Sequence, residues 1–103
     1  IFQPHRYSRT SYLLDDFIKV LKKINILYIL DIYPAGEKPI KNISSINLVK
    51  QLKRETKNIF YVRKKDNLNS ILKSYFQENN TIIFMGAGSI TNMAHDLFNL
   101  NDQ

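Results

Sequence analysis

Short apolar runs alternate with helical patterns along the whole chain, and this alternation restricts the fold more than any other feature of the sequence. The longest apolar run covers residues 26–32, and others cover residues 58–62 and 81–85. The apolar start at Ile1 and Phe2 is typical of the end of one more strand. Continuous runs of this kind indicate strands that are buried on both faces, as in a parallel sheet.

A helical pattern follows each apolar run. The predicted apolar helix faces consist of Leu13, Leu14, Phe17, Ile18 and Leu21, then Ile46, Val49 and Leu52, then Leu68, Ile71, Leu72, Tyr75 and Phe76, and finally Ile90, Met93, Ala94, Leu97 and Phe98. The candidate N-caps are Ser8, Thr10 or Ser11, then Ser44 or Ser45, then Asp66 or Asn67, and finally Ser89. Strand and helix in alternation predict a three-layer, Rossmann-like α/β domain with a mainly parallel sheet and four βα units.

The length of 103 residues predicts one domain that spans residues 1–103. The chain has no cysteine, which excludes disulfides and thiolate zinc sites. No apolar run approaches the roughly twenty residues of a membrane span, and no signal peptide is visible, so we expect a cytoplasmic protein without a membrane partner. Because the first residue is Ile1 and not methionine, we also expect a piece of a longer protein.

The net charge of +6 leaves two interpretations open. A small basic α/β domain could be a free-standing module that binds a nucleotide or RNA. However, eleven of the fifteen cations are lysines scattered through the predicted helices and loops, and no nucleic-acid-binding motif is present. We therefore expect no nucleic-acid partner, and the free-standing module remains the alternative function.

Four segments are expected to carry the chemistry, because the loops that follow parallel strands all leave one edge of the sheet, where ligands bind. These segments are residues 4–9, 31–39, 63–66 and 86–89. The opposite edge holds only short links from helix to strand. Function is therefore expected at the first edge.

The first of these segments is a basic cluster formed by His5, Arg6 and Arg9 at a junction of strand and helix. Arg6 and Arg9 are three residues apart and share a face if the turn is helical. Two guanidiniums beside a helix N-terminus form a site for a carboxylate or a phosphate. His5 either positions such a carboxylate or hydrogen-bonds to a neighbouring loop.

The last segment is a glycine turn formed by Gly86, Ala87, Gly88 and Ser89. Backbone N–H groups in such a turn can approach an anion closely, with the helix dipole behind them. The alternative is a tight turn in which Ser89 only caps the helix. Thr91 stands at the third glycine position of a dinucleotide fingerprint, so a dinucleotide site is not expected.

Several kinds of catalytic site have no motif in this sequence. There is no phosphate-binding Gly-x-x-x-x-Gly-Lys-Ser/Thr loop, no serine nucleophile elbow and no close pair of carboxylates. His95 is expected on a helix surface, and it lies far from His5 in the sequence, so no metal site is expected. The sequence predicts a binding domain with no catalytic residue of its own.

Four motifs resemble one known family in order and spacing. They are FQPHRYSRT at residues 2–10, DDF at 15–17, DIYPAGEKPI at 31–40 and GAGSI at 86–90. Together they resemble the C-terminal domain of the Mur ligase family of peptidoglycan synthesis, over nearly the whole chain. The first two motifs resemble the branch of the family that adds L-alanine.

The resemblance implies an ATP-dependent acid–amino-acid ligase with three domains, of which this chain is the last. It implies that ATP and Mg²⁺, bound mainly by a central domain, activate the carboxylate of UDP-N-acetylmuramate as an acyl phosphate, to which L-alanine is added. The C-terminal domain closes over the central domain of the same chain and forms much of the amino-acid pocket. The segment alone is expected to be inactive.

The resemblance also assigns site residues. His5, Arg6 and Arg9 fall on the family's contacts to alanine and to the muramoyl carboxylate. The turn from Gly86 to Ser89 falls where relatives bind the amino acid. The segment from Tyr33 to Glu37 matches a family signature for which the residues suggest only support of the pocket rim.

Overall fold

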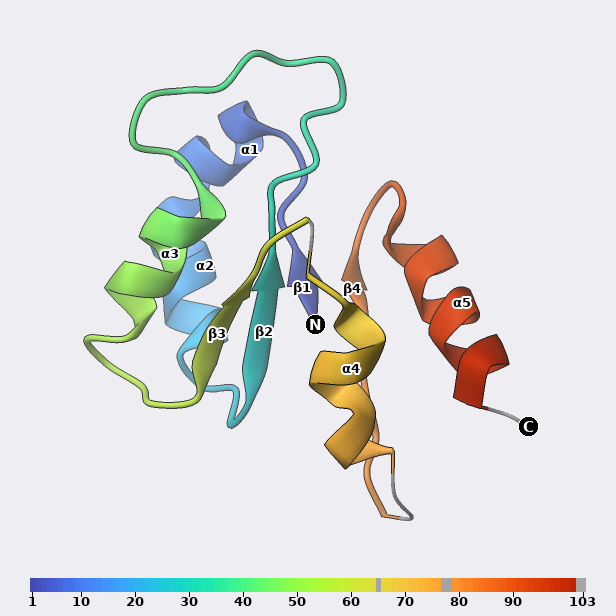
Figure 1. The fold of residues 1–103 in the computed structure, drawn as a ribbon. Helices are drawn as coiled ribbons and strands as arrows, with labels where there is room; N and C mark the ends of the chain where they lie inside the picture. The colour runs from blue at the N-terminus through green and yellow to red at the C-terminus, as the bar shows by residue number, and fades with distance from the viewer. Residues whose placement is uncertain (65, 77–78, 102–103) are drawn as a thin grey trace.

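Four parallel strands form the centre of the protein in the computed structural model, which describes residues 1–64, 66–76 and 79–101. The strands are β1 (Phe2–Gln3), β2 (Leu27–Leu30), β3 (Ile59–Val62) and β4 (Met85–Gly86). Their order across the sheet is β3-β2-β1-β4 (Figure 1). The predicted α/β class with a parallel sheet is therefore confirmed.

The strand pairs differ in length. β2 and β3 pair along all four residues, from Leu27 opposite Ile59 onward. β1 pairs with β4 through Phe2 opposite Met85 and Gln3 opposite Gly86. The prediction of a strand over residues 81–85 was wrong in its extent, because in this register residues 81–84 lie beyond the position opposite Phe2, the first residue of β1.

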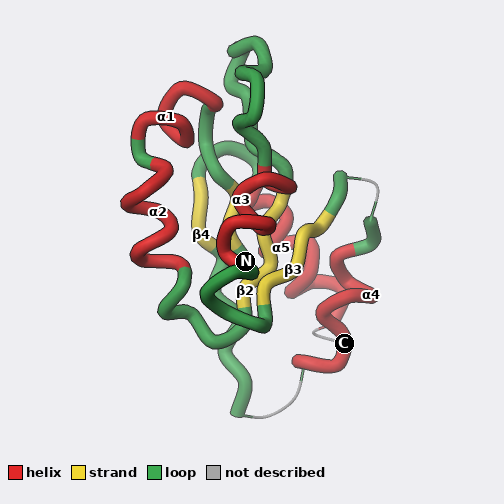
Figure 2. The backbone as a smooth tube through the Cα atoms, turned by 90° about the vertical axis from the view of Figure 1, so that its left-hand side faces the viewer, coloured by secondary structure: helices red, strands yellow, loops and turns green. Residues whose placement is uncertain are grey.

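Helices cover both faces of the sheet. On one face lie α1 (Tyr7–Tyr12), α2 (Leu14–Leu21) and α3 (Ser45–Leu52). On the other lie α4 (Leu68–Leu72), continued by the 3₁₀ turn η1 (Lys73–Tyr75), and α5 (Ile90–Asn101) (Figures 1 and 2). None of the helices in the described ranges is long and apolar enough to cross a membrane.

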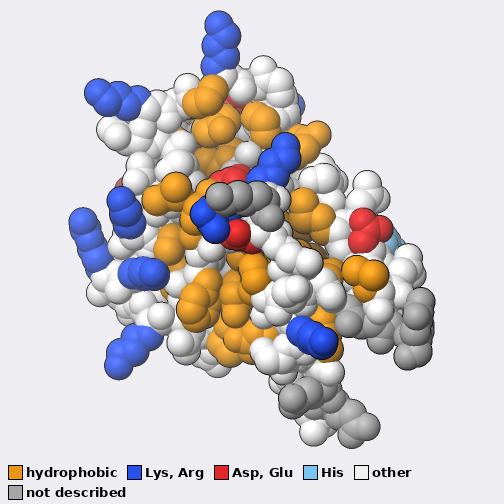
Figure 3. All heavy atoms as spheres, in the orientation of Figure 1, with side chains coloured by type: hydrophobic (Ala, Val, Ile, Leu, Met, Phe, Trp, Pro, Cys, Tyr) orange, Lys and Arg blue, Asp and Glu red, His pale blue; other side chains and the backbone are white. Residues whose placement is uncertain are grey.

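Positive charge is dispersed over the face of the molecule that Figure 3 shows. In the view of Figure 3, lysine and arginine side chains stand mostly around the margin, while hydrophobic side chains gather towards the centre. The sequence carries a net charge of +6, but this face does not gather it into one continuous patch.

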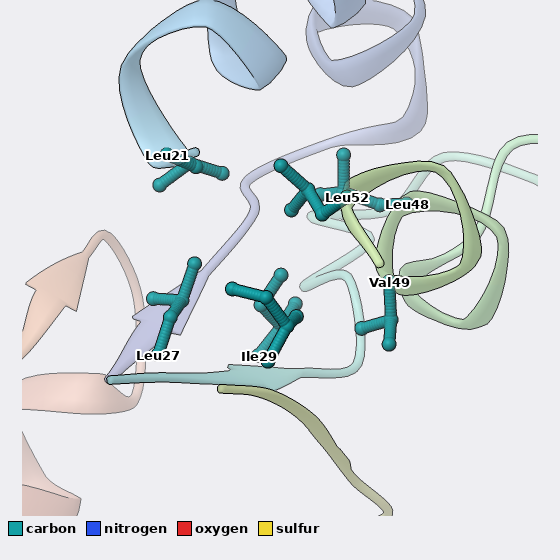
Figure 4. Close-up of a cluster of buried hydrophobic side chains, with 7 residues drawn as sticks. Leu21, Leu27, Ile29, Leu48, Val49 and Leu52 are labelled. Carbon is teal, nitrogen blue, oxygen red and sulfur yellow. The ribbon is translucent and has the colours of Figure 1, made fainter. Parts of the chain in front are cut away.

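The core has two parts, one on each face of the sheet. Leu27 and Ile29 of β2 pack under Leu21, Leu48, Val49 and Leu52 of α2 and α3 (Figure 4). Leu30 of the same strand points to the other face and joins the cluster that α4 and α5 cover. Successive residues of a strand point to opposite faces, so a strand covered on both sides needs a continuous apolar run. This explains why residues 26–32 do not alternate between apolar and polar.

The predicted starts are correct for three of the four predicted helices, and two of them have a side-chain cap. Ser44 caps α3, with its Oγ accepting a hydrogen bond of 3.2 Å from the Asn47 N–H. Asn67 caps α4 and accepts from the Ser70 N–H at 3.2 Å. Ser89 directly precedes α5, where its carbonyl oxygen accepts from the Met93 N–H at 3.2 Å.

The predicted N-cap of the first helix was wrong. The helix begins at Tyr7, and its N-cap residue, Arg6, makes no side-chain capping bond. Ser8 lies in the first turn, and Thr10 is buried inside the helix, where its Oγ donates to the Arg6 carbonyl oxygen at 2.8 Å. The apolar pattern of residues 13–21, with an N-cap upstream of it, predicts one continuous helix, but Leu13 separates α1 from α2.

The last two helices differ from the prediction in detail. α4 gives way to a 3₁₀ turn at Lys73, so the regular helix is shorter than its apolar pattern. In α5, Ile90 and Leu97 are buried, but Phe98 is 63% exposed, because it lies one residue around the helix from the face that packs. Lys65, part of the predicted segment 63–66, lies outside the described residues.

Candidate functional site at the switch point of the sheet

The strand order creates a crevice at one place on the sheet. The chain runs from β1 to β2 to β3 in one direction and then returns to the other side of β1 to form β4. The loops that follow β1 and β4 therefore diverge at the carboxyl edge, which is the point where ligands bind in open α/β sheets. The basic cluster follows β1, and the glycine turn follows β4, so both predicted segments lie at this point (Figure 1).

Tyr33, in the loop that follows β2, contacts both segments. Its ring is stacked on that of His5, with 5.5 Å between ring centroids and 9° between planes. On the other segment, a Cβ added to Gly88 would lie 3.0 Å from Cε1 of Tyr33. Gly88 also has a φ of +78°, which favours glycine. Glycine at this position thus lets the turn approach the tyrosine ring.

Backbone hydrogen bonds fix the same loop to the end of β1. The Tyr33 N–H donates to the Pro4 carbonyl oxygen at 2.9 Å, and the Arg6 N–H donates to the Tyr33 carbonyl oxygen at 2.8 Å. Arg6 itself has a φ of 68° with a ψ of 142°, a conformation that few residues other than glycine adopt. The surrounding bonds hold Arg6 in this conformation.

The side chains of Arg6 and Arg9 are exposed at this edge. Within the described ranges, neither guanidinium forms an ion pair with a carboxylate. Guanidinium groups that are exposed and not already paired are suited to bind a carboxylate or phosphate in bidentate fashion. Arg6 is the N-cap residue of α1, with non-helical backbone angles, and Arg9 lies within the helix, so the helical turn assumed for a shared face does not extend to Arg6.

A carboxylate of the protein itself occupies the N-terminus of α1. Oε1 of Glu37 accepts from the Ser8 N–H at 3.0 Å, and Oε2 accepts from Ser8 Oγ at 2.5 Å. The hydrogen bonds from Ser8, with a contribution from the positive charge of Arg6, lower the pKa of Glu37. The prediction that this helix N-terminus binds an external anion is therefore not met, because Glu37 occupies it. Only the guanidinium side chains of Arg6 and Arg9 remain to bind one.

Sequence reasoning missed this role of Glu37. The segment from Tyr33 to Glu37 was expected only to support the pocket rim. A signal was present, because the loop carries a carboxylate at the same sheet edge as a helix that starts with cations and no acidic residue. Acidic groups favour helix N-termini, so a carboxylate from another loop is a natural partner.

A cavity of about 690 Å³ lies beside the switch point, on the α4 and α5 side of the sheet. Ser89 of the glycine turn lines it, together with Tyr33, Asp31 and Met93. His5, Arg6 and Arg9 are not among its lining residues. Tyr33 thus separates the basic cluster, on one side, from the cavity on the other.

Several polar and charged groups at this cavity are bonded within the fold. Tyr61 Oη donates to Asp31 Oδ1 at 2.5 Å, and the Lys64 N–H donates to Asp31 Oδ2 at 3.2 Å. Burial and the bond to Asp31 raise the pKa of Tyr61 to about 12. Arg63 pairs with Asp66, with 3.1 Å between Nη2 and Oδ1. Of the charged side chains that line this cavity, Asp31 thus accepts two hydrogen bonds, and Arg63 and Asp66 pair with each other.

The remaining predicted site residues lie as follows. Gly86 ends β4, where a Cβ would come within 2.9 Å of the Gln3 carbonyl oxygen, and Ala87 follows it on the surface. His95 is exposed on α5, as expected. In the part of the chain that the structure describes, no three histidine, aspartate or glutamate side chains are placed to share a metal ion.

The fold and the site define a Rossmann-like α/β domain with two exposed guanidiniums beside a glycine turn at its switch point. No protein-family model matches the chain. Curated proteins do match it, among them several that carry the name UDP-N-acetylmuramate–L-alanine ligase. The protein of Rickettsia typhi is 41% identical over 102 residues, which cover 94% of this chain and 20% of the relative.

Two further relatives of the same name match the chain at similar identity. The protein of Sulfurihydrogenibium is 36% identical over 97 residues, covering 94% of this chain and 21% of its own length. That of Aquifex aeolicus is 42% identical over 91 residues, covering 88% and 19%. The chain is thus related to the UDP-N-acetylmuramate–L-alanine ligase family along almost its entire sequence, which confirms the resemblance of its motifs. It spans about a fifth of the length of these relatives.

Proposed function

We propose that this chain is the C-terminal domain of an ATP-dependent ligase that joins L-alanine to UDP-N-acetylmuramate in peptidoglycan synthesis. The name of the relatives supports the reaction. The observation that carries the role of this segment is the exposed pair of Arg6 and Arg9 at the switch point of the sheet. Each substrate brings a carboxylate that such a pair can bind.

The geometry supports separate roles for the three residues of the basic cluster. Arg6 and Arg9 bind carboxylate oxygens through charge-assisted hydrogen bonds. His5 orients the bound group. Its ring is held by the stacking on Tyr33, and its Nδ1 is buried with no hydrogen-bond partner among the described residues. The turn from Gly86 to Ser89 completes the amino-acid site from the other side.

ATP and Mg²⁺ belong to another part of the ligase in this proposal. When bound there, ATP activates the muramoyl carboxylate as an acyl phosphate. Among the described residues of this chain, no group of three or more histidine, aspartate or glutamate side chains is placed to hold a metal ion. The task of this domain is to bind and orient a carboxylate while it closes over the central domain of the same chain.

The test is a pair of substitutions in the full-length ligase. Arg6→Ala or Arg9→Ala should raise the KM for L-alanine or for UDP-N-acetylmuramate and lower kcat/KM by about a hundredfold, since losing a charged hydrogen bond costs on the order of 2–3 kcal/mol. Arg54→Ala is the matched control, because Arg54 is an exposed arginine just beyond the end of α3.

Wild-type kinetics in both variants would contradict the assignment. If the isolated chain instead binds RNA tightly, with an affinity that falls steeply with salt, the free-standing module becomes the better interpretation. The net charge of +6 is the observation in favour of that second candidate.

A further inference from the structure

We propose that Glu37 is a positioning residue, which sets the Arg6–Arg9 pair by closing its loop onto the first turn of α1. The inference rests on the proposed function, because it concerns how the two arginines are held for the substrate carboxylate. Glu37 does not touch the substrate in this proposal. It acts through Ser8, which lies between the two arginines in the sequence.

A turn at residues 34–37 places the Glu37 side chain against the N-terminus of α1. A turn is closed by the Glu37 N–H, which donates to the Pro34 carbonyl oxygen at 3.0 Å. Ala35 and Gly36 adopt positive φ values of 50° and 85° within it. A Cβ on Gly36 would meet nothing within 4 Å, so the glycine serves the backbone conformation and not a close contact.

Glu37 accepts hydrogen bonds at the N-terminus of α1, where no residue of the helix itself supplies a side-chain acceptor. α1 has only six residues, no acidic residue in its first turn, and no side-chain cap from Arg6. Short helices are marginal without partners for their first N–H groups. Glu37, 29 residues away in sequence, accepts from both the backbone and the hydroxyl group of Ser8.

The same loop holds Arg6 from its other side. The Tyr33 carbonyl oxygen accepts the Arg6 N–H at 2.8 Å, and Thr10 donates twice to the Arg6 carbonyl oxygen, from N at 3.2 Å and from Oγ at 2.8 Å. Arg6 therefore stands between two anchors of one loop, Tyr33 before the turn and Glu37 after it. Losing the second anchor frees the first turn of α1 and spreads the positions of both guanidiniums.

The experiment compares Glu37→Ala and Glu37→Gln in the full-length ligase, with Glu55→Ala as the control. Glu55 is an exposed glutamate that pairs with Lys22 at 3.8 Å, away from this loop. We expect Glu37→Ala to raise the KM for the substrate whose carboxylate binds the arginines by about tenfold, since small displacements of binding groups carry large costs. The KM for ATP should stay unchanged, and Glu37→Gln, which keeps one acceptor, should fall between.

A purely structural role would lower the amount of active enzyme, and hence kcat, without changing that KM. Ser8→Ala combined with Glu37→Ala should behave as Glu37→Ala alone, because Glu37→Ala already removes the hydrogen bond that Ser8→Ala removes. Fully additive effects, or a wild-type KM in folded Glu37→Ala, would overturn the inference. If Glu37→Ala does not fold, Glu37→Gln and Ser8→Ala carry the same comparison.

The two proposals fail separately. If Arg6→Ala and Arg9→Ala raise the KM but the Glu37 variants do not, the positioning role is wrong and the proposed function stands. If the arginine variants show wild-type kinetics, the proposed function is wrong, and the positioning role fails with it.

Discussion

The loops after β1 and β3 leave the same edge of one sheet, and each carries arginine, but their arginines differ in what surrounds them. Arg63 pairs with Asp66, and its neighbour Lys64 donates its backbone N–H to Asp31. Arg6 and Arg9 stand exposed, with no ion pair in the described part of the chain. The difference teaches that a position at the carboxyl edge of the sheet does not by itself suit an arginine for ligand binding. A guanidinium that already pairs with a carboxylate of the protein has fewer hydrogen-bond donors left for a ligand.

Tyr33 contacts both the basic cluster after β1 and the glycine turn after β4, and the largest expected effect comes from disturbing this junction. Gly88→Ala should destabilise the folded protein by about 3 kcal/mol, because it adds strain at a φ of +78° and places a Cβ 3.0 Å from the Tyr33 ring. Urea unfolding of the wild-type and variant proteins measures this difference.

Gly36→Ala provides the matched control for that substitution. Its φ of +85° is similar, but a Cβ there would meet nothing within 4 Å. We expect it to cost only the backbone part, about 1 kcal/mol. Equal losses in the two variants would show that the contact with Tyr33 contributes little.

A middle-sized effect is expected on the cavity side. Tyr61→Phe removes the hydroxyl group that donates to Asp31 and should cost about 1 kcal/mol at neutral pH. In the wild-type protein, the raised pKa of Tyr61, about 12, means that its contribution is complete below the ordinary tyrosine value and is lost as pH rises through 12.

The variant without this hydroxyl should therefore lose less stability between pH 10 and 12 than the wild type, as measured by thermal unfolding across that range. Tyr28, whose pKa is also raised to about 12, remains in both proteins and sets the background. Identical pH curves for variant and wild type would argue against the bond between Tyr61 and Asp31.

The smallest effect is expected from Arg63→Ala, which tests the comparison most directly. Its guanidinium is already paired with Asp66, so in the full-length ligase the change in kcat/KM should stay below about twofold, as for most exposed ion pairs. A loss as large as that of Arg6→Ala would show that the charged cavity, and not the basic cluster, binds the substrate.

Much of the architecture could be predicted because the signals are local. The unbroken apolar run through Ile29 and Leu30 requires cover on both faces, and the spacing of apolar residues marks the helices between the strands. The caps Ser44 and Asn67 bond to residues three positions ahead, so they too are visible in the sequence. The edge of the sheet that carries the candidate site follows from the same pattern.

What the sequence determined by itself is therefore the alternation of strands and helical segments and the edge at which the loops after the strands meet. Only the tertiary structure decided the strand order and the short pairing of β4. It also decided the position of Tyr33 between His5 and Gly88 and the capping of α1 by Glu37. The physical reason is the distance along the sequence between the groups that interact. Periodicity and local caps depend on residues within one turn, whereas a carboxylate 29 positions away finds its partner only when packing brings the two loops together.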